Sequence, residues 1–253
     1  MRPTLLFTIF GAVLALWATR TEFNVMTAIA CMYAVSLAPL VVLLVRLPKV
    51  QLAGTGRSVR EGLTALLNGG TGYSAVWTGQ FLMELANSIA LLYLYYYLQD
   101  VIHYPKPGTG QLILVGVAVG ATILATVTIG RLADRSAGYR RYAMLAATLL
   151  AATGFVLAVV SSWDPVIVCA FALGAGYGAY QSASSALSLT VLPDRASAAR
   201  DLGIINIASS IPQVIGPSVA ALVITTGAGY RGLFAFAGLL ALGAAAAFSC
   251  VPS

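Results

Sequence analysis

Long apolar runs separated by short polar segments extend along almost the whole chain. A helix needs roughly 20 consecutive apolar residues to cross a hydrocarbon layer of about 30 Å, and in lipid its backbone groups must pair internally. Eight runs approach or exceed that length and are nearly free of charged residues. They cover residues 5–18, 25–45, 74–98, 111–129, 142–161, 165–192, 202–225 and 232–251. The pattern predicts an all-α polytopic membrane protein with about eight transmembrane helices.

The first run, residues 5–18, is the shortest and has two interpretations. A basic start followed by a short apolar run also fits a secretory signal peptide. The residues that follow, Trp17 to Arg20, make a poor small-residue cleavage site. We therefore interpret this run as a membrane span, and the orientation of the other loops does not depend on that choice.

Composition supports the membrane interpretation. Of the 253 residues, 59% are hydrophobic and 9% are charged, whereas a soluble domain has roughly 25% charged residues. A soluble enzyme and a disordered chain are thereby excluded. The net charge of +6 does not indicate a nucleic-acid partner, because the basic residues form no clustered face or stripe.

The basic residues predict the orientation, since Lys and Arg in short loops favour the cytoplasmic side. With the N-terminus inside, the 14 Lys and Arg residues lie in cytoplasmic loops except for Arg20, Lys106 and Arg231. This bias agrees with an even number of spans. We expect an integral protein of the plasma (inner) membrane with both termini in the cytoplasm.

The longest polar stretch divides the chain into unequal parts. Residues 1–45 hold two predicted helices, residues 46–73 form a basic, glycine-rich cytoplasmic loop, and residues 74–253 hold six predicted helices. The loop is expected to stay near anionic lipid through its charge. Membrane lipid is therefore one expected partner.

The segment between runs 111–129 and 142–161 combines glycines, arginines and one carboxylate. Gly130 and Gly138 fit positions where a tight connection between two helices turns sharply. Asp134 can accept charge-assisted hydrogen bonds from arginines or from a neighbouring helix N-terminus. The candidate residues of this segment are Gly130, Asp134, Arg135, Gly138, Arg140 and Arg141. The alternative is a basic cytoplasmic loop with turn glycines and no further role.

This string, G-R-L-A-D-R-S-A-G-Y-R-R, resembles motif A of the major facilitator superfamily, G-x-L-x-D-R-x-G-R-R/K. It departs by one extra residue before Gly138 and by Tyr139 where a basic residue is common. The resemblance implies a gating loop, and it implies that the eight predicted helices correspond to the family's helices 5 to 12. The family's first four helices would then be lacking. Asp134 would contact the cytoplasmic end of the helix at residues 5–18.

A narrower resemblance concerns residues 98–102 and 191–213. Both segments are similar to the glycoside-pentoside-hexuronide and sucrose-type branch, which couples sugars to a cation. Drug or metabolite exporters of the same superfamily share much of this background. The resemblance therefore implies a sugar-like solute, with an exporter as the alternative.

Glu84 is the one charged residue inside the predicted spans. Ionisable residues in the bilayer are costly and usually face a bundle interior or an aqueous cavity. Gln80 and Asn87 share its helical face, at four residues before and three after. A carboxylate in such a place can take up and release a proton near neutral pH, which alternating access would turn into a coupling step. The alternative is a protonated Glu84 with a structural role.

Other polar side chains in the spans are weaker candidates for contacts with the solute or proton: Gln181, Asn206 and Gln213, together with Tyr177, Tyr180 and Ser210. Each can equally join two helices by a hydrogen bond. Pro212, Gly216 and Pro217 favour a loosened helix of the kind in which transporters place binding groups. The other span glycines, including Gly174, Gly176 and Gly178 and the pair Gly116 and Gly120, are expected to permit close helix packing.

These observations predict a secondary active transporter of a small polar, sugar-like solute, coupled to a proton or another cation by alternating access. Catalytic residues, metal sites and cofactors are not expected, because the single His103 excludes an H-E-x-x-H zinc site. Expected partners are lipid, the solute, the proton or cation, and an N-terminal half or further copies of the chain. The alternatives are an exporter, or a truncated or half transporter acting as a fragment, oligomer or partner subunit.

Overall fold

The computed structural model describes residues 71–136, 138–192 and 198–252. All of them belong to the second of two compact units, Arg57–Ser253. The two helices predicted within residues 5–45, and the predicted loop up to residue 70, lie outside the described residues.

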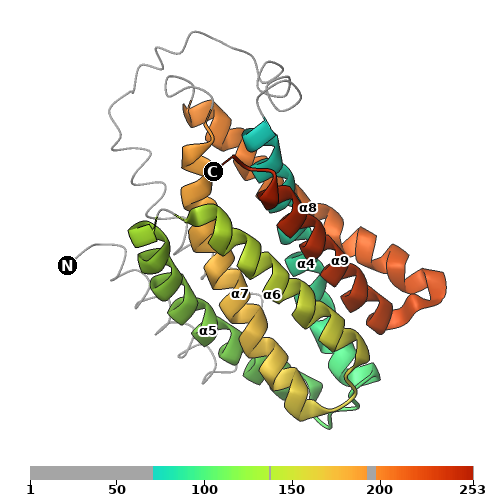
Figure 1. The fold of residues 1–253 in the computed structure, drawn as a ribbon. Coiled ribbons are helices and arrows are strands. Elements are labelled where there is room, and N and C mark those ends of the chain that lie inside the picture. Colours follow the sequence, from blue (N-terminus) through green and yellow to red (C-terminus); the bar gives the residue numbers. More distant parts are fainter. Residues whose placement is uncertain (1–70, 137, 193–197, 253) are drawn as a thin grey trace, which may run out of the picture. The chain divides into compact units, whose positions relative to one another are not determined.

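The described part of the chain consists of long helices (Figure 1). They are α4 (Thr71–Asp100), α5 (Pro107–Ser136), α6 (Tyr139–Val159), α7 (Trp163–Thr190), α8 (Ala198–Val223) and α9 (Gly229–Ser249). Each corresponds to one predicted apolar run, so the sequence prediction is confirmed for this region. The largest difference is at α5, which ends at Ser136 rather than near residue 129. The first half of the arginine-rich segment is therefore helical.

These helices have the length and composition of membrane spans. Five stretches of the described residues are long and apolar enough to cross a membrane, and the fifth, Asp201–Ser249, contains both α8 and α9. At 1.5 Å per residue, a helix of 30 residues such as α4 or α5 is about 45 Å long, which exceeds the hydrocarbon thickness.

The helices form two triplets with related packing. In the first triplet α4 packs on α8 and α9, and in the second α7 packs on α5 and α6, while α6 and α9 contact each other between them. Exchanging α4–α6 with α7–α9 reproduces this set of contacts, and α4 and α7 run in opposite directions. The described region thus has the inverted-repeat arrangement of many secondary transporters. Figure 1 shows α5, α6 and α7 on one side and α4, α8 and α9 on the other.

Close packing of α5 and α7 depends on glycine. A Cβ atom at Gly174 would overlap the carbonyl group of Ala118, and one at Gly178 would overlap that of Thr122. The space thus saved lets the Thr122 hydroxyl reach the Gly174 carbonyl oxygen at 3.0 Å. The predicted packing role is therefore confirmed for the glycines of α7.

Glycines elsewhere behave differently from the prediction. Gly116 and Gly120 on α5 have no atom of the described residues within 4 Å of an added Cβ, so the expectation of close packing is wrong for them there. Between α8 and α9 the turn Ile224–Ala228 contains Gly227 with φ 86°, a left-handed backbone conformation that favours glycine. The chain changes direction at this turn, whereas α8 stays helical through Pro212 and Pro217.

Candidate functional site

Glu84 lies near the middle of α4 and is 4% exposed. The hydroxyl of Tyr177 on α7 is 3.5 Å from its Oε1 atom and 3.4 Å from its Oε2 atom. Tyr180, one turn further along α7, is 1% exposed and lies within hydrogen-bonding reach of both the Glu84 carboxylate and the Ser184 hydroxyl. The carboxylate that the sequence singled out thus faces two phenols across the α4–α7 interface.

Gln80, one helical turn from Glu84, is also buried in this interface. Its Nε2 group donates to the Ser184 hydroxyl at 2.6 Å and to the Ser188 hydroxyl at 2.9 Å. The Ser188 hydroxyl in turn donates to the Ser184 carbonyl oxygen at 2.8 Å. The Gln80 Oε1 atom is buried and has no hydrogen-bond partner among the described residues.

Four residues of α7 therefore complete the site, and the sequence analysis did not assign them to it as a group. Tyr177, Tyr180, Ser184 and Ser188 follow one another at intervals of three, four and four residues. That spacing places them on one face of a helix. The signal was present in the sequence, but it is clear only once α4 is known to supply the facing residues.

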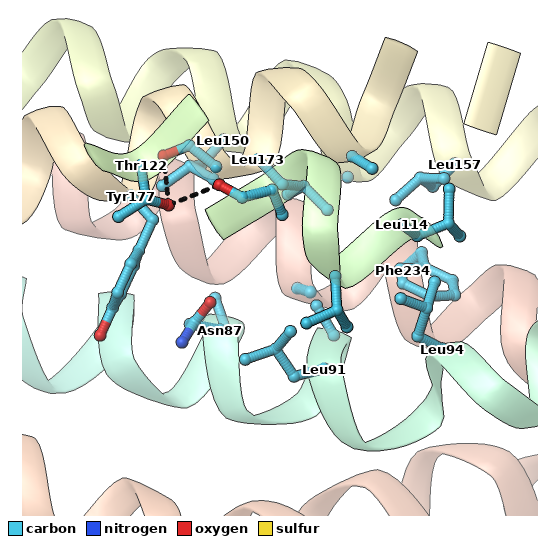
Figure 2. A pocket seen from close by; sticks show the side chains of 18 of the residues that line it. Asn87, Leu91, Leu94, Leu114, Thr122, Leu150, Leu157, Leu173, Tyr177 and Phe234 are labelled. Carbon is cyan, nitrogen blue, oxygen red and sulfur yellow. Dashed lines mark hydrogen bonds between the residues drawn. The ribbon is translucent and has the colours of Figure 1, made fainter. Parts of the chain in front are cut away.

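A cavity of about 310 Å³ adjoins this polar cluster. Its walls come from α4, α5, α6, α7 and α9, and consist mainly of Leu, Ile, Val and Ala side chains. The polar residues that line it are Asn87, Thr122 and Tyr177. In Figure 2 the Asn87 amide projects from α4 toward the cavity, and the Tyr177 ring extends toward α4.

The three polar residues differ in what they offer a ligand. The Thr122 hydroxyl already contacts the carbonyl oxygens of Ala118 at 2.8 Å and Gly174 at 3.0 Å (Figure 2). The Tyr177 hydroxyl faces Glu84. Asn87 is half-buried, and no other described residue is hydrogen-bonded to its amide. The cavity thus presents apolar walls and one amide with free hydrogen-bonding capacity.

Tyr177 belongs to both parts of the site. Its ring lines the cavity, and its hydroxyl reaches the buried carboxylate. An ionised carboxylate accepts a hydrogen bond from this phenol, whereas a protonated one can donate instead. A change in the protonation of Glu84 therefore alters the position that suits the Tyr177 side chain, and with it the wall of the cavity.

The remaining predicted contact residues do not join the site. Gln181, Asn206 and Gln213 are exposed, and none of them lines the cavity. Gln181 lies on α7 one turn after Tyr177, but its side chain is exposed, whereas Tyr180, Ser184 and Ser188 are buried. The prediction that these three side chains share a site with Glu84 is therefore not supported by the geometry, whereas Gln80 and Asn87 do lie beside it.

The arginine-rich segment lies at one end of the bundle. The Asp134 carboxylate is exposed and accepts a hydrogen bond from the Tyr139 hydroxyl at 3.1 Å. Tyr139, which departs from the family pattern, therefore pairs with the acidic residue of the motif. Arg135 and Arg141 are exposed and Arg140 is half-buried.

The two motif glycines are not needed for left-handed turns. Gly130 is inside α5, where an added Cβ would lie 2.8 Å from the Ser182 hydroxyl oxygen of α7. Gly138 precedes α6 with φ −94°, which other residues adopt. The prediction of a turn glycine is wrong for Gly130, because α5 continues to Ser136, whereas Gly138 does lie in the short connection between α5 and α6. The predicted contact of Asp134 with residues 5–18 lies outside the described residues.

Comparison with known proteins gives one match. A model of the Major Facilitator Superfamily matches residues 76–252, which include nearly all of the described helices. No curated protein and no solved structure matches the chain. The matched region has the inverted-repeat packing and the apolar, membrane-length helices of an integral membrane protein. The chain belongs to the Major Facilitator Superfamily, a family of secondary transporters.

Proposed function

We propose that this protein is a proton-coupled secondary transporter in which Glu84 is the coupling carboxylate and the adjoining cavity holds the solute. The observation that carries the proposal is the double contact of Tyr177. Its ring lines the cavity, and its hydroxyl lies 3.4 Å from a carboxylate oxygen of Glu84. Occupancy of the cavity and protonation of Glu84 act on the same side chain, so each alters the other.

The lining of the cavity indicates the class of solute. A sugar presents several hydroxyl groups, and each of them loses its hydrogen bonds to water on burial unless the protein replaces them. This cavity offers the Asn87 amide and otherwise mainly aliphatic walls. A compact, mostly apolar solute with one polar group for Asn87 fits these walls better. The lining thus favours an exporter-like substrate class over the sugar-like solute that the sequence resemblance implies.

Alternating access turns this arrangement into coupling. Burial in apolar surroundings disfavours an ionised carboxylate, whereas contact with water favours it. Glu84 is therefore expected to bind a proton before the bundle closes around it and to release the proton once water reaches it from the opposite side. Tyr177 transmits the change in the protonation of Glu84 to the solute in the cavity, and no covalent chemistry is required.

The test uses the purified full chain in liposomes with an imposed pH gradient. Two groups of probes are compared, the sugars glucose and sucrose and a group of small aromatic amides and amines. Pyranine inside the liposomes reports proton movement. We expect gradient-driven uptake of members of the apolar group, and loss of that uptake in Glu84→Gln with solute exchange retained. Asp164→Asn removes an exposed carboxylate in the first turn of α7 and is the matched control.

Each part of the proposal can fail separately. Wild-type gradient dependence in Glu84→Gln would contradict the coupling role. Uptake of the sugars alone would contradict the proposed solute class. No driven uptake of any probe by the wild type would favour the alternative in which the chain acts as a subunit or oligomer component.

A further inference from the structure

The polar side chains that are hydrogen-bonded across the α4–α7 interface lie at Glu84 and on one side of it. We call the end of the bundle that carries Arg131, Arg135, Arg140 and Arg141 the basic end; α4 begins there and α7 ends there. Between Glu84 and the basic end the interface contains Tyr180, Gln80, Ser184 and Ser188. In the opposite direction the two helices line the cavity, where Asn87 is the polar residue and the others are apolar, among them Leu94, Val166, Ala170 and Leu173.

The polar residues make a connected series. Tyr180 lies one turn before Ser184 on the same face of α7, and Gln80 is hydrogen-bonded to Ser184 and Ser188. From Tyr180 to Ser188 the series covers about 12 Å at the 1.5 Å rise of a helix. Ser188 lies two residues before the end of α7, where Thr190 is exposed. The series therefore runs from the buried carboxylate toward the basic end, and its last member, Ser188, lies two residues from the exposed Thr190.

One atom in this series lacks a partner. The Gln80 side chain is 6% exposed, and its Oε1 atom accepts no hydrogen bond from any described residue. The orientation of the amide follows from its neighbours, because the Ser188 hydroxyl already donates to the Ser184 carbonyl oxygen and must accept from Nε2. Buried polar atoms in proteins nearly always have a partner, and an internal water is the usual one where the protein supplies none.

We propose that Gln80, Ser184 and Ser188 form a hydrated proton-exchange path between Glu84 and the basic end, with a water molecule bound at Gln80 Oε1. The proposal rests on the proposed function, in which Glu84 gains and loses a proton. In each step one O–H bond breaks as another forms, through water and the serine hydroxyls. The net result is the transfer of one proton between solvent and the Glu84 carboxylate. Gln80 keeps its protons and positions the water and the two hydroxyls.

Among the described residues, no charged side chain lies beside Glu84 that could take the place of this path. The ionisable side chains in contact with Glu84 are the phenols of Tyr177 and Tyr180. On α5 to α9, the charged side chains that the structure describes lie within about two turns of a helix end: Arg131, Asp134, Arg135, Arg140, Arg141, Asp164, Asp201 and Arg231. The exchange rate of Glu84 is therefore expected to depend on the Gln80 and serine groups.

Time-resolved infrared spectroscopy after a pH jump tests the path without any transported solute. The purified full chain in lipid nanodiscs is used, and the Glu84 carboxyl band is identified by its loss in Glu84→Gln. We expect the double variant Ser184→Ala/Ser188→Ala, and separately Gln80→Met, to slow the protonation of Glu84 by about tenfold or more, because the hydroxyls or the water needed for each hop are missing.

Ser185→Ala is the matched control, because Ser185 is exposed and its hydroxyl donates within α7 to the Gln181 carbonyl oxygen at 2.7 Å. The rate of Glu84 protonation in this variant should stay within about twofold of the wild-type rate, because surface substitutions usually have small effects. Thermal unfolding of each variant tests for a merely structural role, which would lower the unfolding temperature and leave the rate unchanged.

The possible outcomes separate the two proposals. A wild-type protonation rate in the double serine variant overturns the path and leaves Glu84 as the coupling group. A wild type without a Glu84 band that responds to pH overturns both. If Gln80→Met does not fold, the double serine variant still tests the path, because it keeps the Gln80 side chain and removes only two hydroxyl groups.

Discussion

Helix α7 packs against α5 through one face and against α4 through another, and the two interfaces are built from different residues. Toward α5 it presents Gly174 and Gly178, which allow backbone contact, and threonine hydroxyls of α5 bond directly to its carbonyl oxygens. Toward α4 it presents tyrosines and serines that surround a buried carboxylate. The first interface is in backbone contact at its two glycines, whereas the second contains a titratable group and an oxygen atom without a hydrogen-bond partner among the described residues.

Close packing and titratable side chains thus occupy different faces of α7. Because α5 and α7 are locked together, movement of α7 relative to α4 is expected to carry α5 with it. A substitution on the α5 face should then change stability, and one on the α4 face should change proton coupling.

Gly174→Ala should give the largest loss of stability. The added methyl group would overlap the Ala118 carbonyl group, which is main chain and cannot rotate away. We expect the free energy of unfolding, measured by detergent titration in mixed micelles, to fall by about 2 kcal/mol or more. Gly116→Ala is the control, since no atom of the described residues lies within 4 Å of its added Cβ, and it should be neutral or stabilising by up to about 1 kcal/mol. Equal effects at the two positions would contradict a locked α5–α7 interface.

Tyr177→Phe should affect coupling rather than stability. The ring that lines the cavity remains, and only the hydroxyl near Glu84 is lost. A hydrogen bond to a charged group contributes about 1.5 kcal/mol, so gradient-driven uptake of a solute found in the probe screen should fall about tenfold. Tyr96→Phe, on an exposed tyrosine of α4, should keep the wild-type rate. A normal rate in Tyr177→Phe would show that the cavity and Glu84 do not communicate through this hydroxyl.

Thr122→Val removes one interhelical hydrogen bond from the locked interface. Its hydroxyl contacts the Gly174 carbonyl oxygen as well as that of Ala118 within its own helix. The control Thr128→Val loses only an intrahelical bond to Leu124. The difference between the two free energies of unfolding should be about 0.6 kcal/mol, the average for such bonds in membranes. A difference near zero would mean that the glycines alone hold α5 to α7.

Tyr139→Phe at the basic end should have the smallest effect. It removes an exposed hydrogen bond of 3.1 Å to Asp134, and exposed pairs of this kind contribute less than about 1 kcal/mol. The unfolding temperature should change little, and Asp134→Asn should behave in the same way. A much larger loss in Asp134→Asn alone would indicate that this carboxylate has a second partner outside the described residues.

The helices could be predicted from the sequence because each one is a long apolar run. The exception, the end of α5, shows the limit of that signal. Arginines and Asp134 end the apolar run near residue 129, but the backbone continues as a helix to Ser136 because charged residues are compatible with helices once these leave the membrane. Hydropathy locates the part of a helix that lies in lipid, not the end of the helix.

The site was only partly predictable. Gln80, Glu84 and Asn87 were grouped correctly because they belong to one helix and share a face of it. Gln181, Asn206 and Gln213 do not line the cavity beside Glu84, and a single polar residue on an apolar helix does not reveal which way that helix is rotated. The serines and tyrosines opposite Glu84 belong to α7, and the order of the helices along the chain does not reveal that α7 faces α4.

The position of Glu84 near the midpoint of α4 has an electrical consequence. A proton that travels from the basic end to this carboxylate crosses roughly half of the membrane thickness. A full crossing changes the energy of a unit charge by about 2.3 kcal/mol per 100 mV, so this half-crossing changes it by about 1.2 kcal/mol. Protonation of Glu84 would then respond to voltage as well as to pH, and an imposed membrane potential alone would shift its occupancy several-fold.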